Sequence, residues 1–291
     1  MEASEATPTR PPHPTPASSS PSPLSLRMWR PAALRNLRNQ WSVLQRAKDR
    51  WLAAADTGRS QASALVNTYL SQRCMRGMDL GVLKDMQGIR EKASSKLARR
   101  EEQCRGMLLS AYKEMVIAMS DLVKASQSMR CFSKGPANSP LAQFSDRQDD
   151  LNDSGDGGGI PVCKWLSIFD FESLAQELVG MFVTELQLKR LLLVGLLSIN
   201  CKEVVEHRRS LNSTDELYAG EFLEFESIGL QAGESCPLPE NWHDISQTPR
   251  NDDPSHETLG VYLTAWLNNV NIKTSRIDEI FELVGEEMRS K

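Results

Sequence analysis

Apolar positions recur at spacings of three and four along the N-terminal part of this 291-residue chain. The first series follows Pro31 and consists of Leu34, Leu37, Trp41, Leu44, Lys48, Trp51 and Ala55. A seven-residue repeat of this kind predicts a long helix with a coiled-coil seam. The series resumes beyond Gly58, so this glycine marks either a kink in one long helix or a short turn between two.

A second series predicts a helix from about Leu80 to Ser128, with no proline to interrupt it. Its seam consists of Leu83, Met86, Ile89, Ala93, Leu97, Cys104, Leu108, Ala111, Met115, Ala118 and Leu122. Small and flexible side chains specify packing weakly, so we expect a partner helix, from this chain or another, to complete the seam.

The pattern changes in the C-terminal half. Residues 133–160 are rich in Pro, Ser, Gly and Asp, which predicts a hydrated linker. Asp170 is suited to be the N-cap of the next helix, which begins at Phe171. From Leu186 to Leu197 this helix is apolar on nearly every side, so we expect it to be buried on more than one face, within its own bundle or in a complex.

Residues 199–255 show no sustained period and predict an irregular excursion, with a marginal strand or helix at the segment EFLEF. Two short helices are predicted after it, at 256–268 and 275–289. Ser275 and Asp278 stand at the spacing of a capping box at the start of the second.

These elements predict an all-α fold, in which a long antiparallel coiled-coil helical hairpin carries additional C-terminal helices packed as a bundle. The first 26 residues have almost no bulky apolar side chains whose burial could offset the entropy of ordering them, so they are expected to form a disordered tail. The predicted organisation is a Pro/Ser-rich tail at 1–30, the hairpin at 31–132, an acidic Gly/Ser linker at 133–160 and a helical region at 161–291.

The composition gives no signal for a membrane, for secretion or for a metal. No stretch reaches about 18 uninterrupted apolar residues, and Glu2 and Glu5 with no apolar segment after them argue against a signal peptide, so we expect a soluble intracellular protein. Six cysteines stand singly, which predicts reduced thiols rather than a zinc site or a disulfide framework. Cys201 with His207 is the nearest approach to a ligand pair, and we expect no metal and no cofactor.

Charge divides the chain into two halves. Residues 27–134 carry 21 Lys and Arg against 9 Asp and Glu, whereas residues 135–291 carry 12 against 27. This asymmetry is typical either of nucleic-acid binding by the basic half or of pairing between the two halves within one bundle. We favour pairing, because the basic residues are interspersed with acidic ones rather than gathered into a stripe with stacking aromatics.

No enzyme motif is present. The sequence lacks a P-loop, a dinucleotide-binding glycine motif, a zinc-protease H-E-x-x-H, a nucleophile elbow and an EF-hand loop. The segment DSGDGGG at 153–159 resembles a phosphate or calcium loop but lacks the Lys or the bidentate Glu that either needs, so it is assigned to the linker. Glu101-Glu102 and Glu286-Glu287 are interpreted as solvated surface, because neighbouring helical residues point about 100° apart.

Candidate phosphoacceptors precede proline in the segments predicted to be irregular, where a proline-directed kinase could reach them. They are Thr7, Thr15, Ser20, Ser22, Ser139 and Thr248.

Three segments resemble the cyclin-dependent-kinase-interacting protein family (CINP), in the order in which that family has them. They are WLAAADTG at 51–58, which is similar to the family's W-x-x-x-x-D-x-G segment, ELQLKR at 185–190, and LGVYLTAWL at 259–267. The tail and the excursion are longer than in animal members, which indicates a divergent lineage such as a plant one.

The resemblance implies a nuclear adaptor without catalytic activity, linked to cell-cycle and checkpoint kinases, to DNA replication and to an AAA-ATPase assembly that acts on replisomes and ribosome precursors. The residues expected at the interaction face or in the core beneath it are Trp51, Leu178, Phe182, Leu186, Leu188, Lys189, Arg190, Tyr262, Leu263, Trp266 and Leu267. Nucleic-acid binding through residues 27–134 is the alternative, and a coiled-coil tether is a third interpretation.

Overall fold

The computed structural model describes residues 23–75, 77–134, 143–148, 153–199, 215–230 and 254–289. Its elements are α1 (Pro23–Met75), the 3₁₀ helix η1 (Gly81–Leu83), α2 (Ile89–Gln127), β1 (Phe132–Lys134), β2 (Gln143–Ser145), α3 (Ile168–Ser198), α4 (Glu221–Ser227), α5 (His256–Asn268) and α6 (Thr274–Arg289). The predicted helical fold, with a long helix pair and further helices packed on it, is confirmed.

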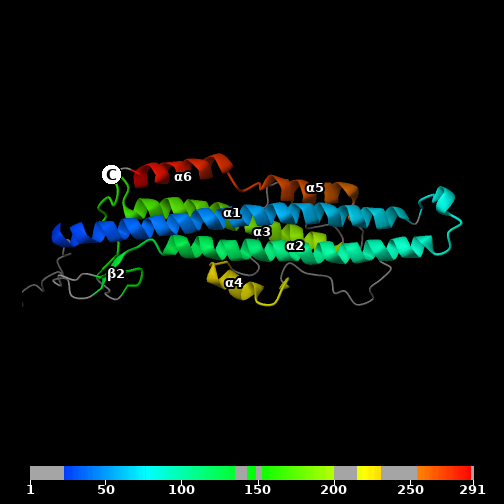
Figure 1. The fold of residues 1–291 in the computed structure, drawn as a ribbon, viewed down its shortest axis with the longest axis horizontal. Helices are drawn as coiled ribbons and strands as arrows, with labels where there is room; N and C mark the ends of the chain where they lie inside the picture. The colour runs from blue at the N-terminus through cyan, green and yellow to red at the C-terminus, as the bar shows by residue number, and fades with distance from the viewer. Residues whose placement is uncertain are drawn as a thin grey trace, which may run out of the picture.

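The long helices α1 and α2 lie antiparallel along the whole length of the molecule (Figure 1). Their shared core is apolar, and the Arg50 guanidinium bridges to Glu114 at 2.7 Å on its outside. Helix α3 lies along this pair, and α5 and α6 follow one another on the α1 side of the bundle, whereas α4 lies on the α2 side. The C-terminal helices thus complete the seams that the hairpin leaves open.

Helix α1 is continuous through Gly58, which settles the question of kink or turn in favour of one helix. It also begins at Pro23, so the prediction that residues 1–30 form a disordered tail is wrong for its last eight residues. Trp29 explains the extension, because its ring is buried and its indole N–H donates to the Cys131 carbonyl at 2.8 Å. Pro31 is accommodated within the helix.

Helix α2 begins nine residues later than predicted, at Ile89. The preceding residues form tight turns in which Gly81 and Gly88 adopt positive φ angles of 51° and 71°. Glycine tolerates this left-handed backbone at no steric cost. Leu83 and Met86, which were assigned to the seam, are therefore exposed residues of the turn between the helices.

The structure describes residues 133–134, 143–148 and 153–160 of the predicted linker at 133–160. β1 and β2 pair antiparallel, with Ser133 opposite Phe144. The loop at 153–159 packs on the hairpin, because a Cβ at Gly157 would lie 2.4 Å from the Trp29 ring. The Asp153 carboxylate accepts hydrogen bonds from the backbone N–H groups of Ser133 and Gly155, and the Asp156 carboxylate accepts one from Gly158. The loop is therefore a packed turn rather than a linker.

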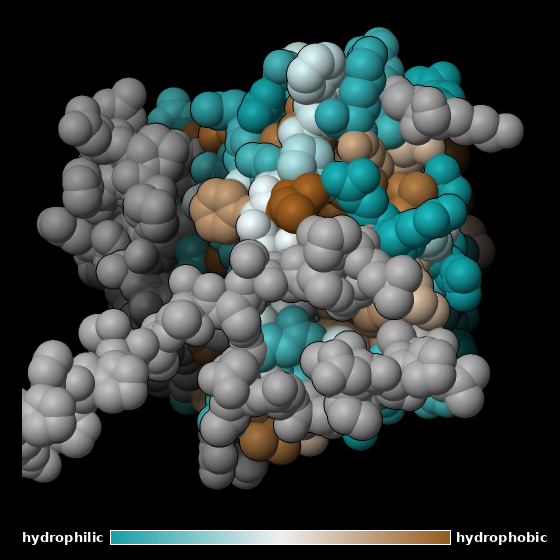
Figure 2. Space-filling model, turned by 90° about the vertical axis from the view of Figure 1, so that its left-hand side faces the viewer, coloured by the Kyte–Doolittle hydropathy of each residue, from teal (hydrophilic) through white to brown (hydrophobic). Residues whose placement is uncertain are grey.

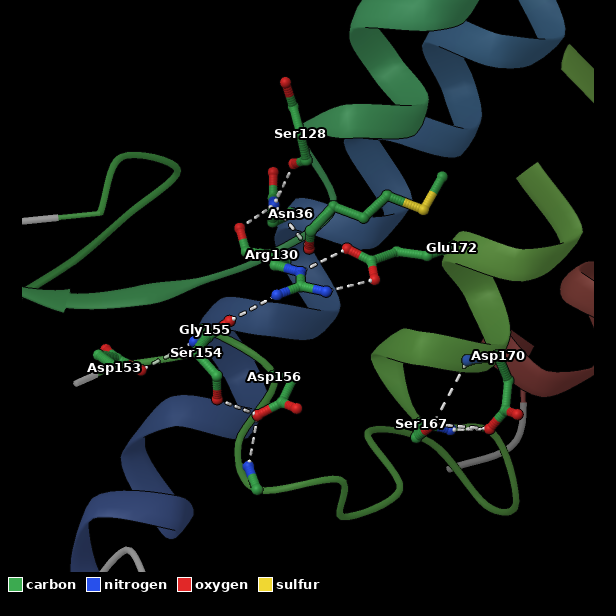
Figure 3. Close-up of polar contacts among 12 residues, drawn as sticks. Asn36, Ser128, Arg130, Asp153, Ser154, Gly155, Asp156, Ser167, Asp170 and Glu172 are labelled. Carbon is green, nitrogen blue, oxygen red and sulfur yellow. Dashed lines mark hydrogen bonds and ion pairs between the residues drawn. The ribbon is translucent and has the colours of Figure 1, made fainter. Parts of the chain in front are cut away.

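Polar contacts join α1, the C-terminal end of α2 and the start of α3 at the end of the molecule that carries β1 and β2 (Figure 3). The Asn36 amide on α1 donates to the Ser128 carbonyl at 2.8 Å. The Arg130 guanidinium makes two hydrogen bonds to Glu172 on α3, at 2.8 and 3.1 Å, and a third to the Ser154 carbonyl at 3.2 Å. Seen end-on, this face carries hydrophobic side chains scattered among hydrophilic ones (Figure 2).

Two predicted helix starts are corrected. Helix α3 begins at Ile168, and Ser167 is its N-cap, with Asp170 as the reciprocal partner in a capping box. The predicted role of Asp170 as N-cap is therefore wrong, because an aspartate at the third helical position can reach back to the cap. Helix α6 begins at Thr274, which places Ser275 inside the first turn rather than at the cap.

Stability at alkaline pH should report the packing of the Cys131 thiol. Burial, with a smaller contribution from Asp153, raises the pKa of Cys131 to about 11, whereas an unfolded thiol titrates near pH 8.5 or so. Between these values the folded state binds more protons than the unfolded state, so the free energy of unfolding falls as pH rises through this window. Urea denaturation at a series of pH values from about 8 to 11 measures this effect. We expect the free energy of unfolding to fall more steeply with pH in the wild type than in Cys131→Ala. Cys74→Ala, at an exposed thiol, should match the wild type; equal slopes in all three would contradict the assignment.

Candidate functional site: the junction of α1, α3 and α5

The three segments that carry the family resemblance meet in space, although more than 200 residues separate the first from the last. Gly58 on α1 lies against Trp266 on α5, and Lys189 on α3 contacts the last turn of α5. We call the cluster of Ala55, Gly58, Glu185, Lys189 and Trp266 the α5 junction. It lies inside the bundle, where α5 packs on both α1 and α3.

A buried ion pair forms the centre of the α5 junction. Lys189 Nζ lies 2.9 Å from Glu185 Oε1, and both side chains are completely inaccessible to solvent. Lys189 also donates to the Trp266 carbonyl at 2.5 Å, and Glu185 Oε2 accepts from the backbone N–H of Asn271 at 2.9 Å. The cation thus meets the negative end of the α5 dipole, and the anion holds the turn that follows α5. Burial lowers the pKa of Lys189, and Glu185 acts in the opposite direction.

Two glycines allow α5 to approach closely. A Cβ at Gly58 would lie 2.6 Å from the Trp266 ring, and a Cβ at Gly195 would lie 2.8 Å from the Tyr262 ring. The Trp266 indole N–H donates to the Ala55 carbonyl at 3.2 Å, which fixes the ring over the glycine. The tryptophan-glycine pattern at 51–58 is therefore explained by packing, since larger residues at position 58 would displace the α5 helix.

Most of the predicted interaction residues are core residues. Trp51 packs edge-on against Phe182, with ring centroids 5.1 Å apart, and the expected burial of the helix after Leu186 is provided by the chain's own helices. The buried members are Trp51, Leu178, Phe182, Leu186, Leu188, Lys189 and Trp266, the half-buried ones are Arg190, Tyr262 and Leu263, and Leu267 is exposed. Most of these residues are therefore committed to contacts within the chain itself.

Arg190 points away from the α5 junction and fixes α4. Its guanidinium makes two hydrogen bonds to Glu221, at 2.9 and 3.3 Å, and Glu221 also accepts from the Tyr112 hydroxyl at 2.8 Å. Glu221 is fully buried, and burial together with the Glu221 charge raises the pKa of Tyr112. Sequence reasoning singled out Arg190 but missed its partners, because no periodic pattern surrounds the EFLEF segment.

Replacing Glu221 by alanine should detach α4 from the bundle. The change leaves Arg190 and Tyr112 without their shared acceptor, and we expect a loss of about 2 kcal/mol in the free energy of unfolding, as for hydrogen bonds to a charged group. The matched control is Glu226→Ala on the exposed side of the same helix, which should change stability by less than about 0.5 kcal/mol. Urea denaturation followed by circular dichroism measures both, and equal effects would contradict this role for Glu221.

Two glutamates predicted at the surface are buried. Glu101 pairs with Arg105 at 2.6 Å, and the same guanidinium donates to the Leu197 and Ile199 carbonyls at the end of α3. Glu287 on α6 accepts from the three backbone N–H groups of residues 164–166, at 3.2, 3.1 and 3.4 Å. The interpretation of Glu101 and Glu287 as solvated is therefore wrong, because Glu101 is held by a buried guanidinium and Glu287 by three backbone N–H groups.

The interpretation that the basic half (27–134) pairs with the acidic half (135–291) receives limited support. Arg130 and Glu172 form an ion pair between the basic and acidic halves. The pairs Arg50–Glu114 and Arg276–Glu177 each lie within one half. Among the described residues, the ion pair between Arg130 and Glu172 joins the two halves at the end shown in Figure 3.

Several sequence candidates fall outside the described residues. These are all six candidate phosphoacceptors, namely Thr7, Thr15, Ser20, Ser22, Ser139 and Thr248, and also Cys201 and His207. Within the described ranges no group of three or more His, Cys, Asp or Glu side chains is arranged to hold a metal ion. No helix in this part of the chain combines the length and the hydropathy needed to cross a membrane.

An open groove of about 570 Å³ is lined by the part of α1 from Arg59 to Ser71, by Leu97 and Arg100 of α2, and by Leu267 of α5. Small side chains make up most of its α1 lining, namely Ser60, Ser63, Ala64, Asn67, Thr68 and Ser71. Comparison of the chain with protein families, with curated proteins and with solved structures finds no match.

Proposed function

We propose that this chain is a non-enzymatic nuclear adaptor similar to the cyclin-dependent-kinase-interacting proteins. In this proposal it links cell-cycle and checkpoint kinases to DNA replication, as a subunit of an AAA-ATPase assembly that acts in replisome and ribosome maturation. The observation that supports it best is the α5 junction, because the three segments that carry the resemblance contact one another there.

The geometry suits an adaptor because it makes a long hairpin rigid. The buried contacts of Lys189 and Glu221 fix α5 and α4 on opposite sides of the bundle, and buried polar contacts of this kind favour one arrangement of helices over others. A rigid body of this length can hold partners bound at its two ends at a fixed separation. Binding partners along such a body requires surface complementarity and no catalytic group.

Affinity purification of the full-length chain from dividing cells, followed by mass spectrometry, tests the proposal. We expect AAA-ATPase subunits, with cell-cycle or checkpoint kinases, to be enriched over a tag-only control. Recovery of a monomer without any ATPase, kinase or replication protein would contradict it.

Nucleic-acid binding by the basic half is a second candidate, favoured by the 21 Lys and Arg against 9 Asp and Glu in residues 27–134. Titration of duplex DNA and of RNA at rising salt concentrations separates the two functions, because phosphate contacts give affinities that fall steeply with salt. The adaptor proposal predicts no binding at physiological salt. Tight, salt-dependent binding there would favour the second candidate.

A further inference from the structure

The turn that joins α1 to α2 lies at the end of the molecule opposite the β1–β2 pair (Figure 1), and four large apolar side chains are exposed on it. We call residues 77–88 the hairpin tip. Met78, Val82, Leu83 and Met86 are exposed there, and Val82 is 93% accessible. Apolar clusters on a soluble protein surface frequently mark binding sites, and methionine side chains adapt readily to different partner shapes.

The hairpin tip is an ordered structure. The Arg90 guanidinium at the start of α2 donates to the Met75 carbonyl and to the Met78 carbonyl, the latter at 2.7 Å. The Gly81 N–H donates to the Asp79 carboxylate at 3.1 Å, and the Leu83 N–H donates to the Leu80 carbonyl at 2.9 Å. The four apolar side chains are thus presented on a folded backbone, which lowers the entropic cost of binding.

Positive charge lies next to this cluster. Lys92, Lys96 and Arg99 follow on the first turns of α2 at spacings of four and three, so they lie on one helix face, and all three are exposed. The span from Lys92 to Arg99 is about 10 Å at the rise of an α-helix. The surface therefore combines an apolar end with a basic face behind it.

We infer that the hairpin tip binds an amphipathic segment of a partner protein, whose apolar side chains cover Met78, Val82, Leu83 and Met86 and whose acidic side chains face Lys92, Lys96 and Arg99. The inference rests on the adaptor function proposed above, for which it supplies one contact surface. A lipid bilayer fits less well, because Asp79 and Asp85 stand within the tip and would have to enter an apolar phase.

Site-specific photocrosslinking of the full-length chain tests this inference. The photoreactive amino acid p-benzoylphenylalanine replaces Val82, the chain is expressed in dividing cells, and mass spectrometry identifies the crosslinked peptides. We expect peptides of other proteins that contain both apolar and acidic residues. Charge reversal by Lys92→Glu, Lys96→Glu and Arg99→Glu together should lower the yield by about tenfold or more. The control Lys124→Glu, at an exposed residue far along α2, should leave the yield unchanged.

Four outcomes would overturn the inference: no crosslink, a crosslink to lipid, a crosslink to a second copy of this chain, or a yield that charge reversal does not change. Failure of the adaptor proposal is recognised separately. If affinity purification enriches ATPase subunits and kinases but the crosslinking at Val82 gives any of these four outcomes, the adaptor proposal stands and the tip inference fails. If acidic peptides are crosslinked and are lost on charge reversal, but affinity purification enriches no ATPase, kinase or replication protein, the tip inference stands and the adaptor proposal fails.

Discussion

Replacing Lys189 by alanine is expected to lower the free energy of unfolding by about 3–5 kcal/mol, the cost of leaving one member of a buried ion pair without its partner. Glu185 would remain in the core, fully inaccessible and without the ammonium group 2.9 Å away. The carbonyl groups of Ala265 and Trp266 would lose their donor as well. Urea denaturation of the purified chain, followed by circular dichroism, measures the loss.

The double variant Lys189→Met/Glu185→Leu distinguishes an uncompensated charge from lost packing. Replacing both members with apolar residues of similar volume removes the buried charge, so we expect the double variant to be more stable than Lys189→Ala. The double variant should remain less stable than the wild type, because Asn271 loses the hydrogen-bond acceptor that Glu185 provides. A Lys189→Ala variant that loses less than about 1 kcal/mol would contradict this account of the ion pair.

The second large effect is expected for Gly58→Ala. Replacing glycine by alanine inside a helix ordinarily raises stability by roughly 0.5–1 kcal/mol. Here the new Cβ would lie 2.6 Å from the Trp266 ring. That ring is buried and is held by its hydrogen bond to Ala55, so it cannot move aside freely. We therefore expect a loss of about 1–3 kcal/mol, as for overpacking in a core.

Gly106→Ala is the matched control for this prediction. Gly106 lies inside α2 and is exposed, and a Cβ there would contact nothing within 4 Å. We expect this variant to gain the ordinary helix stabilisation of roughly 0.5–1 kcal/mol. Thermal and urea denaturation should thus give changes of opposite sign for the two glycines. A gain in stability at both positions would show that α5 does not press on Gly58.

The sequence predicts the long helices well because their signal is local. Heptad spacing over residues 34–55 and over the second seam requires knowledge of near neighbours only. The ends of the helices are harder to predict, because distant contacts decide them. Helix α1 extends back to Pro23 through the packing of Trp29 on Gly157, and α2 starts late because of the backbone conformation at Gly88. Neither the contact between Trp29 and Gly157 nor the left-handed conformation of Gly88 can be recognised from the local pattern.

The α5 junction shows the same limit for function. Lys189 and Trp266 could be singled out as residues of unusual segments, but their roles depend on contacts between residues 77 positions apart. Spacing along one helix indicates that Glu185 and Lys189 share a face, and it does not reveal that this face is covered. The sequence shows that Lys189 stands within a strongly apolar helix. The structure shows that it is buried there and paired with Glu185.

Hydrogen exchange of the α5 backbone amides tests most directly whether the three resembling segments form one junction that holds this helix. In Gly58→Ala, we expect the amides of residues 259–267 to exchange at least about tenfold faster than in the wild type, because local opening of α5 becomes easier, while the amides of α2 keep their protection. In Gly106→Ala, α5 should exchange as in the wild type. Unchanged exchange of α5 in Gly58→Ala would contradict the account.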